Sequence, residues 1–142
     1  MSKPESNIPR ALIEQTIATS RAATDEGDWD AFVDCFADGG RFMNSALPAP
    51  LEGREAIRAW AKTWPRVVNI EEWRTIDGGR FAIGWNERHY DSPPDDIYRG
   101  MSTFTFDAEG RIVDYEGIFD PAKVAAAYQR VASKARGQGQ SS

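Results

Sequence analysis

The hydrophobic pattern of the chain changes its period about half way along. In the first half, apolar residues recur three and four positions apart, which is typical of one face of a helix. From about residue 69, apolar and polar residues alternate, which indicates strands with one buried face. Helices followed by strands predict an α+β domain with its helices on one face of an antiparallel sheet. A chain of 142 residues is long enough for one domain with its own core.

Two helices are predicted at the start of the chain. The first is expected from Pro9 to about Glu26, because a proline can open a helix and Gly27 can end it. Asp28 is expected to cap the second helix, since a short acidic side chain accepts hydrogen bonds from free backbone N–H groups. That helix carries an apolar stripe of Trp29, Phe32, Val33 and Phe36.

The remaining elements are bounded by glycine, proline and aspartate. We expect a short strand at Arg41–Asn44, a third helix between Gly53 and Pro65, and a last helix that begins at Asp120–Pro121. Between the last two helices the alternation and turn residues predict four strands, at Asn69–Ile76, Arg80–Tyr90, Tyr98–Phe106 and Arg111–Phe119.

Composition limits the classes of function. The domain is expected to span residues 8–132, with polar segments at 1–7 and 133–142 outside its core. A net charge of −5 argues against a nucleic-acid partner, and no apolar run approaches a membrane span. The chain has one cysteine, Cys35, and neither a metal-ligand spacing nor a phosphate-binding loop. We therefore expect a cytoplasmic protein that needs no metal or cofactor.

The expected strand Arg80–Tyr90 carries more polar side chains than a core strand. Because strand side chains alternate between faces, one face carries Asn86, Arg88 and Tyr90, and the other carries Trp85, Glu87 and His89. An arginine is seldom buried without a partner, so the face with Arg88 is either solvated or part of a site.

Four short segments carry a family resemblance. These are Gly27–Asp30, Leu51–Ile57, Asp107–Ile112 and Ile118–Asp120. Together with the order of elements, they resemble the nuclear transport factor 2-like superfamily, in its SnoaL-like and limonene epoxide hydrolase-like branches. The resemblance implies a cystatin-like cone, in which a curved sheet and helices enclose an apolar pocket, in a homo-oligomer of two or three chains. Because this fold hosts many chemistries, the activity has to be argued from the site.

The resemblance also allows known active sites to be compared with this chain. In the ketosteroid isomerase branch, the three aligned positions hold residues that cannot exchange protons near neutral pH, namely Ser20, Asn44 and Ser102. In the epoxide hydrolase branch Arg88 and Asn44 match, but the two catalytic aspartates are replaced by Tyr90 and Gly117. Neither of these two reactions is therefore expected unchanged.

The same alignment implies which side chains face the cone. The residues expected to point inward are Phe42, Asn44, Gly84, Asn86, Arg88, Tyr90, Tyr98, Ser102, Tyr115 and Gly117. Those expected on the outer face, where subunits would meet, are Phe81, Ile83, Trp85, Glu87 and His89. Glycines inside strands, here Gly84, Gly100 and Gly117, are expected to leave room for a bulky ligand.

Four residues are the catalytic candidates. Arg88 would stabilise a developing anion or be a structural ion-pair partner; Tyr90 would donate a proton or only line the wall. Asn44 would orient the substrate or satisfy backbone groups, and His89 is the one side chain with an unperturbed pKa near 7. The expected substrate-binding residues are Phe42, Trp60, Trp64, Asn86, Tyr98, Ser102 and Tyr115.

These residues predict a cofactor-independent lyase or dehydratase that acts on a hydroxylated phenolic compound. A para-phenol would serve as the electron sink, giving a quinone methide as the hydroxyl leaves. The most specific form of this prediction rests on a resemblance to diarylpropane formaldehyde lyases, which convert a lignin-derived diarylpropane diol to a stilbene. The alternatives are a SnoaL-like cyclase, a divergent epoxide hydrolase, and a non-catalytic small-molecule-binding or dimerisation module.

Overall fold

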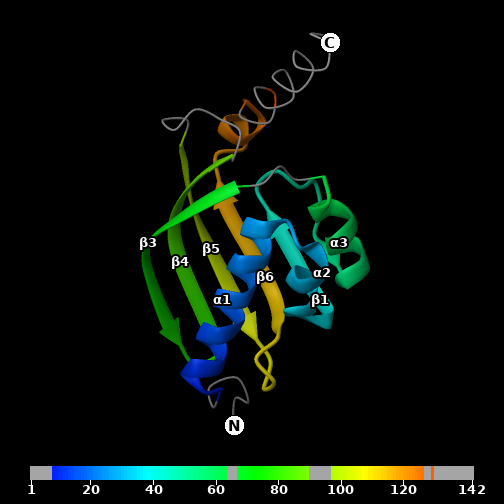
Figure 1. The fold of residues 1–142 in the computed structure, drawn as a ribbon, viewed down its shortest axis with the longest axis vertical. Helices are drawn as coiled ribbons and strands as arrows, with labels where there is room; N and C mark the ends of the chain where they lie inside the picture. Colours follow the sequence, from blue (N-terminus) through cyan, green and yellow to red (C-terminus); the bar gives the residue numbers. More distant parts are fainter. Residues whose placement is uncertain (1–7, 64–66, 90–96, 127–128, 130–142) are drawn as a thin grey trace.

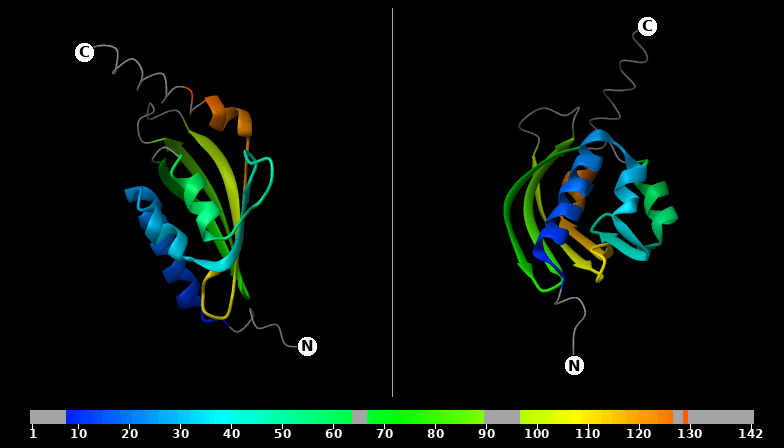
Figure 2. Two further views of the ribbon diagram at one scale, coloured as in Figure 1. Left: turned by 90° about the vertical axis from the view of Figure 1, so that its right-hand side faces the viewer. Right: turned by 60° about the horizontal axis from the view of Figure 1, so that its bottom comes forward.

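The computed structural model of the protein describes residues 8–63, 67–89, 97–126 and 129. They form a curved six-stranded sheet with helices packed against its concave face (Figures 1 and 2). This confirms the predicted α+β cone. The elements in chain order are α1 (Arg10–Glu26), α2 (Trp29–Asp34), β1 (Phe36–Asn44), β2 (Leu51–Glu52), α3 (Arg54–Ala61), β3 (Val67–Asp77), β4 (Arg80–His89), β5 (Tyr98–Phe106) and β6 (Ile112–Phe119).

The end of α1 and the start of α2 lie where their cap residues predict. Gly27 ends α1 in the left-handed conformation, with φ of 72°, which glycine adopts without steric cost. Asp28 caps α2, because its Oδ1 accepts a hydrogen bond from the Ala31 N–H at 3.1 Å. The apolar stripe predicted that the second helix includes Phe36. This was wrong, because Phe36 is the first residue of β1 and pairs with Ile112 of β6.

The sheet has the strand order β2-β1-β6-β5-β4-β3. Its strands β3 to β6 form the predicted antiparallel meander, but β1 pairs with β6 in parallel. β5 has the predicted bounds. β1 begins at Phe36, earlier than the predicted Arg41, and its register is irregular between these two residues. The short β2 was not predicted.

The chain turns back into a helix after β6, as predicted. Residues 121–126 are helical, and the Asp120 Oδ1 accepts a hydrogen bond from the Ala122 N–H at 3.0 Å. Val124 of this helix is buried. Pro65, Trp64, Tyr90 and the predicted terminal segments 1–7 and 133–142 lie outside the described residues.

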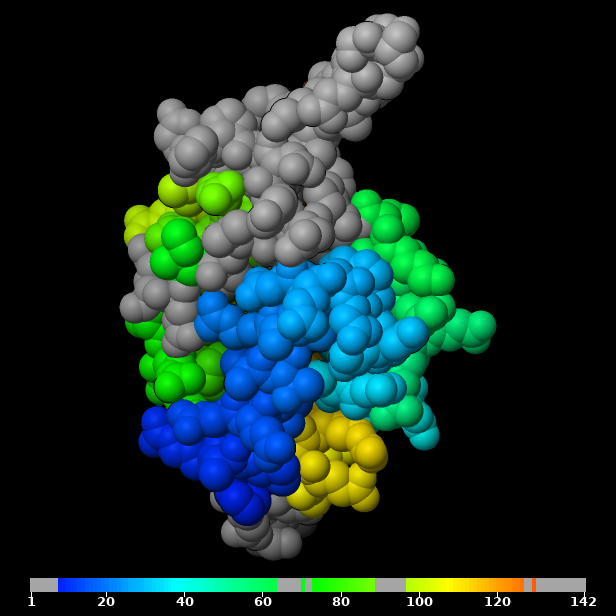
Figure 3. Space-filling model, in the orientation of Figure 1, coloured from blue at the N-terminus to red at the C-terminus, as the bar shows by residue number. Residues whose placement is uncertain are grey.

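The core fills the space between the sheet and α1, α2 and α3. In the space-filling view, α1 in dark blue and α2 in lighter blue cover one face of the molecule (Figure 3). Buried phenylalanines dominate this core, and ring–ring contacts run from α2 into the sheet. The largest fully buried side chains include Phe36, Phe42, Phe81, Phe106, Ile13 and Ile57.

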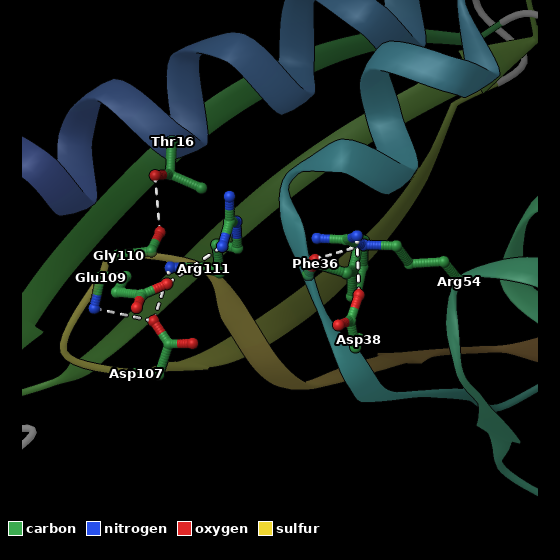
Figure 4. A network of polar contacts seen from close by, with 8 residues as sticks. All are labelled: Thr16, Phe36, Asp38, Arg54, Asp107, Glu109, Gly110 and Arg111. Carbon is green, nitrogen blue, oxygen red and sulfur yellow. Dashed lines mark hydrogen bonds and ion pairs between the residues drawn. The ribbon is translucent and has the colours of Figure 1, made fainter.

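Polar contacts attach α1 to the β5–β6 turn (Figure 4). The Thr16 Oγ1 donates to the Gly110 carbonyl at 2.7 Å. The Asp107 Oδ1 accepts from the N–H groups of Glu109 and Arg111 and so fixes the shape of the turn. The Thr16–Gly110 bond thus attaches α1 to a turn whose shape Asp107 fixes.

A second set of contacts attaches α3 to β1 (Figure 4). The Arg54 Nε donates to the Phe36 carbonyl, and its Nη1 donates to Asp38, both at 2.8 Å. Charge-assisted bonds of this kind are stronger than neutral ones. The helices around the concave face are thus fixed at several points. Within the described residues, no helix is long and apolar enough to cross a membrane.

Candidate functional site

The two faces of β4 are the reverse of those expected. Trp85 and Glu87 point toward the helices and are 5% and 8% exposed, together with the buried Phe81 and Ile83. The predicted outer location of these four residues was therefore wrong. The alternating apolar residues at 81, 83 and 85 identify the buried face, whereas the superfamily alignment was shifted by one residue along this strand. A shift of one residue moves every side chain of a strand to the opposite face.

Asn86 and Arg88 therefore lie on the convex face, and their predicted inward positions were wrong. The Arg99 Nε donates to the Asn86 Oδ1 at 3.1 Å in an exposed pair. Arg88 pairs in register with Val68 of β3 and is partly exposed. The His89 side chain and all of Tyr90 lie outside the described residues.

A cavity of about 110 Å³ lies between the concave face of the sheet and the helices α1 and α2. Half of its sixteen lining residues are aromatic, which favours a ligand with a flat ring. Its polar side chains include Glu87, Ser102 and Tyr115 from the sheet, and Arg21 and Asp25 from α1. This combination of an apolar wall and a few polar groups is typical of small-molecule sites.

A chain of hydrogen bonds crosses three strands at the cavity wall. The Trp85 Nε1–H donates to the Ser102 Oγ at 2.8 Å. The Ser102 Oγ in turn lies 2.9 Å from the Tyr115 Oη. Because the indole N–H is only a donor, Ser102 accepts this bond; in the bond between Ser102 and Tyr115, either hydroxyl can be the donor.

Glu87 brings a carboxylate into the same cavity. The Tyr98 hydroxyl donates to the Glu87 Oε1 at 2.7 Å, across the β4–β5 pair. A buried carboxylate is costly unless it is hydrogen-bonded, so the Tyr98 bond helps Glu87 to remain in the cavity wall. The cavity thus contains an oriented acid–base group.

The Tyr115 hydroxyl remains protonated in this environment. Burial raises the pKa of Tyr115 well above its usual value; the Ser102 hydrogen bond opposes this effect, and the negative charge of Glu87 adds to it. A neutral phenol can donate a hydrogen bond or a proton to an oxygen atom of a ligand. Tyr115 is therefore a hydrogen-bond donor in the same cavity as the carboxylate of Glu87.

The raised pKa of Tyr115 predicts a loss of stability at high pH. Above pH 10.0, the ordinary pKa of tyrosine, the unfolded chain releases the Tyr115 proton while the folded chain keeps it. The free energy of unfolding should therefore fall by up to about 1.4 kcal/mol per pH unit relative to Tyr115→Phe. Urea titrations of both proteins between pH 8 and pH 11 measure this difference. A constant difference across that range would contradict the burial of the hydroxyl.

The other predicted site residues are divided between two places. Phe42, Ser102 and Tyr115 line the cavity, while Tyr98 lies beneath it and binds Glu87. Asn44 and Trp60 instead line a neighbouring groove, where they are joined by Phe119. Trp64 lies outside the described residues.

The strand glycines make room for the chain's own aromatic rings. A Cβ atom at Gly84 would lie 2.2 Å from the Trp73 indole, and one at Gly100 would lie 2.4 Å from the Trp85 ring. At Gly117 it would lie 2.9 Å from the Tyr115 hydroxyl. The expectation that these glycines leave space for a ligand was therefore wrong, because protein side chains occupy all three positions.

Several cavity residues were not predicted, above all Glu87 and Trp85. The alternation of Phe81, Ile83 and Trp85 was a sufficient signal for the buried face, and Glu87 continues it by two residues. Trp29 and Phe32 of α2 were predicted only as a core stripe, yet both line the cavity. Among the described residues, no group of three or more metal-binding side chains is present.

The sequence profile of the SnoaL-like domain family matches residues 17–115, about two thirds of the chain. The chain belongs to the SnoaL-like domain family. This SnoaL-like match includes the second part of α1, all of α2 and α3 and most of the sheet. It also spans the hydrogen-bond chain from Trp85 to Tyr115. No curated protein is similar enough in sequence to match the chain.

Solved structures share the fold. A protein of unknown function with a cystatin-like fold from Methylobium petroleophilum PM1 is 21% identical, with a TM-score of 0.68 over 79% of this chain and 78% of that chain. An NTF2-like protein of unknown function from Burkholderia pseudomallei K96243 is 16% identical, with a TM-score of 0.68 over 82% and 96%. An LEH-like epoxide hydrolase from M. tuberculosis is 14% identical, with a TM-score of 0.68 over 84% and 91%. At these identities the likeness establishes the nuclear transport factor 2-like fold.

Proposed function

We propose that this SnoaL-like protein is a cofactor-independent dehydratase or lyase for a small phenolic alcohol. The observation that carries the proposal is the pairing of a buried carboxylate, Glu87, with a neutral donor hydroxyl, Tyr115, in one aromatic cavity. A carboxylate that can accept a proton and a neutral phenol that can donate one are a usual basis of acid–base catalysis. The catalytic role predicted for Arg88 is therefore assigned to Glu87 and Tyr115.

The proposed reaction needs no proton donor or acceptor other than these two side chains. Glu87 accepts the phenolic proton, the benzylic C–O bond breaks, and Tyr115 gives its proton to the departing hydroxide, so that water and a quinone methide form. In the second step Tyr115 takes a proton from the carbon next to the benzylic position, and Glu87 returns its proton to the phenolic oxygen. The product is a vinylphenol, and both side chains regain their starting state.

The size of the cavity favours a substrate with one ring. Its 110 Å³ is below the range of about 300–1,000 Å³ that holds drug-sized ligands. The more specific prediction, conversion of a diarylpropane diol to a stilbene with release of formaldehyde, requires a second ring to be placed outside this cavity. We therefore propose a phenolic alcohol with a single ring as the main candidate substrate, and a compound with two rings as the second candidate.

Incubation with 1-(4-hydroxyphenyl)ethanol tests the proposal. The expected result is 4-vinylphenol, detected by its ultraviolet absorbance and by chromatography, at a rate well above that of buffer. A diarylpropane diol in a parallel reaction tests the two-ring form through stilbene fluorescence and a formaldehyde assay. Saturable binding of both compounds with no product would contradict the proposal and indicate a non-catalytic binder. A diol formed from an epoxide, with one oxygen from labelled water, would indicate the hydrolase instead.

We also propose that the convex face pairs with a second copy of the chain. Register places Trp73, Gly84, Met101 and Ile118 in one row across four strands, and Trp73 and Ile118 are 48% and 49% exposed. The outer strip predicted from Phe81, Ile83 and Trp85 faces inward, so this row replaces it. Large exposed apolar residues on one face of a sheet, here Trp73 and Ile118, are typical of an interface.

Charge supports a second copy as the partner of this face. Arg99 lies on one side of the row and Glu116 on the other, because Glu116 pairs with Thr103 and Arg99 with Asn86. A two-fold axis along the row would bring Arg99 of one copy toward Glu116 of the other, as an isologous contact requires. Replacement of Ile118 by lysine should then convert a dimer to a monomer in sedimentation velocity. A wild-type monomer at micromolar concentration would contradict the pairing.

A further inference from the structure

A second hollow adjoins the cavity at the end of β1. It is a groove of about 250 Å³ between β1, α3 and the helical residues 121–126. Its lining includes Asn44, Trp60, Thr63, Phe119 and Val124. The proposed acid–base chemistry uses none of these residues, so the groove needs its own explanation.

Asn44 presents a buried donor without a partner in this region. The residue is 2% exposed, and its Oδ1 accepts a hydrogen bond from the Ala46 N–H at 2.9 Å. This bond fixes the orientation of the side-chain amide, because the opposite orientation would place an NH₂ group against a backbone N–H. Among the described residues, the Asn44 Nδ2 is the one buried side-chain nitrogen or oxygen with no hydrogen-bond partner. An unsatisfied buried donor destabilises the fold, so a ligand acceptor would recover free energy there.

Phe119 separates this groove from the aromatic cavity. It lines both hollows and is the last residue of β6. Its backbone N–H donates a hydrogen bond to the Ser45 Oγ at 3.1 Å. Among the described residues, its ring makes tilted contacts with Trp85 and Tyr98, at centroid distances of 6.3 and 6.5 Å. The backbone is fixed, and rotation of this one side chain would join the two hollows.

We propose that the groove is a second ligand subsite, which takes the extension of an aromatic ligand and binds an oxygen acceptor on it through the Asn44 Nδ2. The Nδ2 atom is fully covered in the structure, so the side chains over it have to be displaced when such a ligand enters. The inference rests on the proposed function only in placing the aromatic ring in the main cavity, and it requires no chemical step. A ketone or ether oxygen a few atoms from the ring fits this description.

Two ligands with the same carbon skeleton test the subsite. 4-Phenylbutan-2-one carries a carbonyl oxygen that butylbenzene lacks, so we compare their dissociation constants for the wild type and for Asn44→Leu by calorimetry. The ratio of the dissociation constant of butylbenzene to that of the ketone should be about fivefold greater in the wild type than in Asn44→Leu, because this factor corresponds to the net free energy of one neutral hydrogen bond. Comparing the ratios cancels the different hydration of the two ligands.

Thr63→Val is the matched control, because it removes a hydroxyl that lines the groove but donates to the Trp60 carbonyl at 2.7 Å. It should leave the ketone preference unchanged. If Asn44→Leu does not fold, the Asn44 side-chain amide signal in ¹⁵N spectra of the wild type gives a second reading: it should move with the ketone and not with butylbenzene.

Each outcome separates the subsite from the proposed function. Equal ratios in the wild type and Asn44→Leu, or no amide shift with the ketone, would overturn the subsite even if phenol binds the main cavity. Failure of phenol and both probes to bind would overturn the subsite and the aromatic cavity together. A ketone preference that depends on Asn44, without turnover of any phenolic alcohol, would support the subsite and reject only the chemistry.

Discussion

Glu87→Gln is expected to lower kcat for a phenolic alcohol by about 10²–10⁴-fold, the usual contribution of a positioned acid–base group. The amide has the size of the carboxylate, and its oxygen can still accept the hydrogen bond from the Tyr98 hydroxyl. It cannot accept the phenolic proton. The folded structure should therefore persist while turnover is lost, and a kinetic assay with a thermal melt measures both.

Arg88→Gln is the matched control for this variant. The two positions are adjacent in β4, but the side chains lie on opposite faces of the sheet. Turnover by Arg88→Gln should stay within a few-fold of the wild type. Full activity of Glu87→Gln, or a large loss of kcat in Arg88→Gln with normal stability, would reverse the assignment of the two faces.

Gly100→Ala is expected to have the largest effect on stability. The added Cβ would lie 2.4 Å from the Trp85 ring and 2.8 Å from the Ile118 carbonyl oxygen. This oxygen belongs to the backbone, so it cannot rotate away as a side chain can. Overpacking of this kind costs about 1–3 kcal/mol, occasionally more. Trp85 would be forced out of its bond with Ser102, so aromatic ligands should also bind more weakly. Urea unfolding and calorimetric titration with phenol measure the two effects.

Gly39→Ala provides the control. A Cβ at Gly39 would meet no heavy atom within 4 Å, and the residue has no positive φ. Its free energy of unfolding should stay within about 0.5 kcal/mol of the wild type. Similar losses in both variants would mean that backbone flexibility, and not the Trp85 ring, explains the glycine at position 100.

The local features of the fold were predictable from the sequence because they depend on neighbouring residues. Gly27 and Asp28 fix the boundary between α1 and α2 through their own backbone conformation and side-chain hydrogen bond. The limits of β5 follow from alternation and turn residues. The extent of α2 was not predictable in this way, because the parallel pairing of Phe36 with Ile112 depends on a strand 76 positions later in the chain.

The candidate site was predicted only in part, because it depends on strand faces and register. Ser102 and Tyr115 were placed correctly in the cavity, but β4 was assigned the wrong face. The local signal, Phe81, Ile83 and Trp85 at alternate positions, was correct, and the more distant family alignment was not. The Glu87–Tyr98 bond also requires the β4–β5 register, which the length of the connecting loop does not determine.

The most direct test of this account is a ligand's position relative to two tryptophans on opposite faces of the sheet. Trp85 lines the concave cavity beside Glu87, and Trp73 lies half exposed on the convex side. Nuclear Overhauser spectra of the protein with 1-(4-hydroxyphenyl)ethanol or its product should show contacts between the ligand ring and the Trp85 indole, and none with Trp73. Contacts with Trp73, or a bound ligand with no contact to Trp85, would contradict the concave cavity as the site of function.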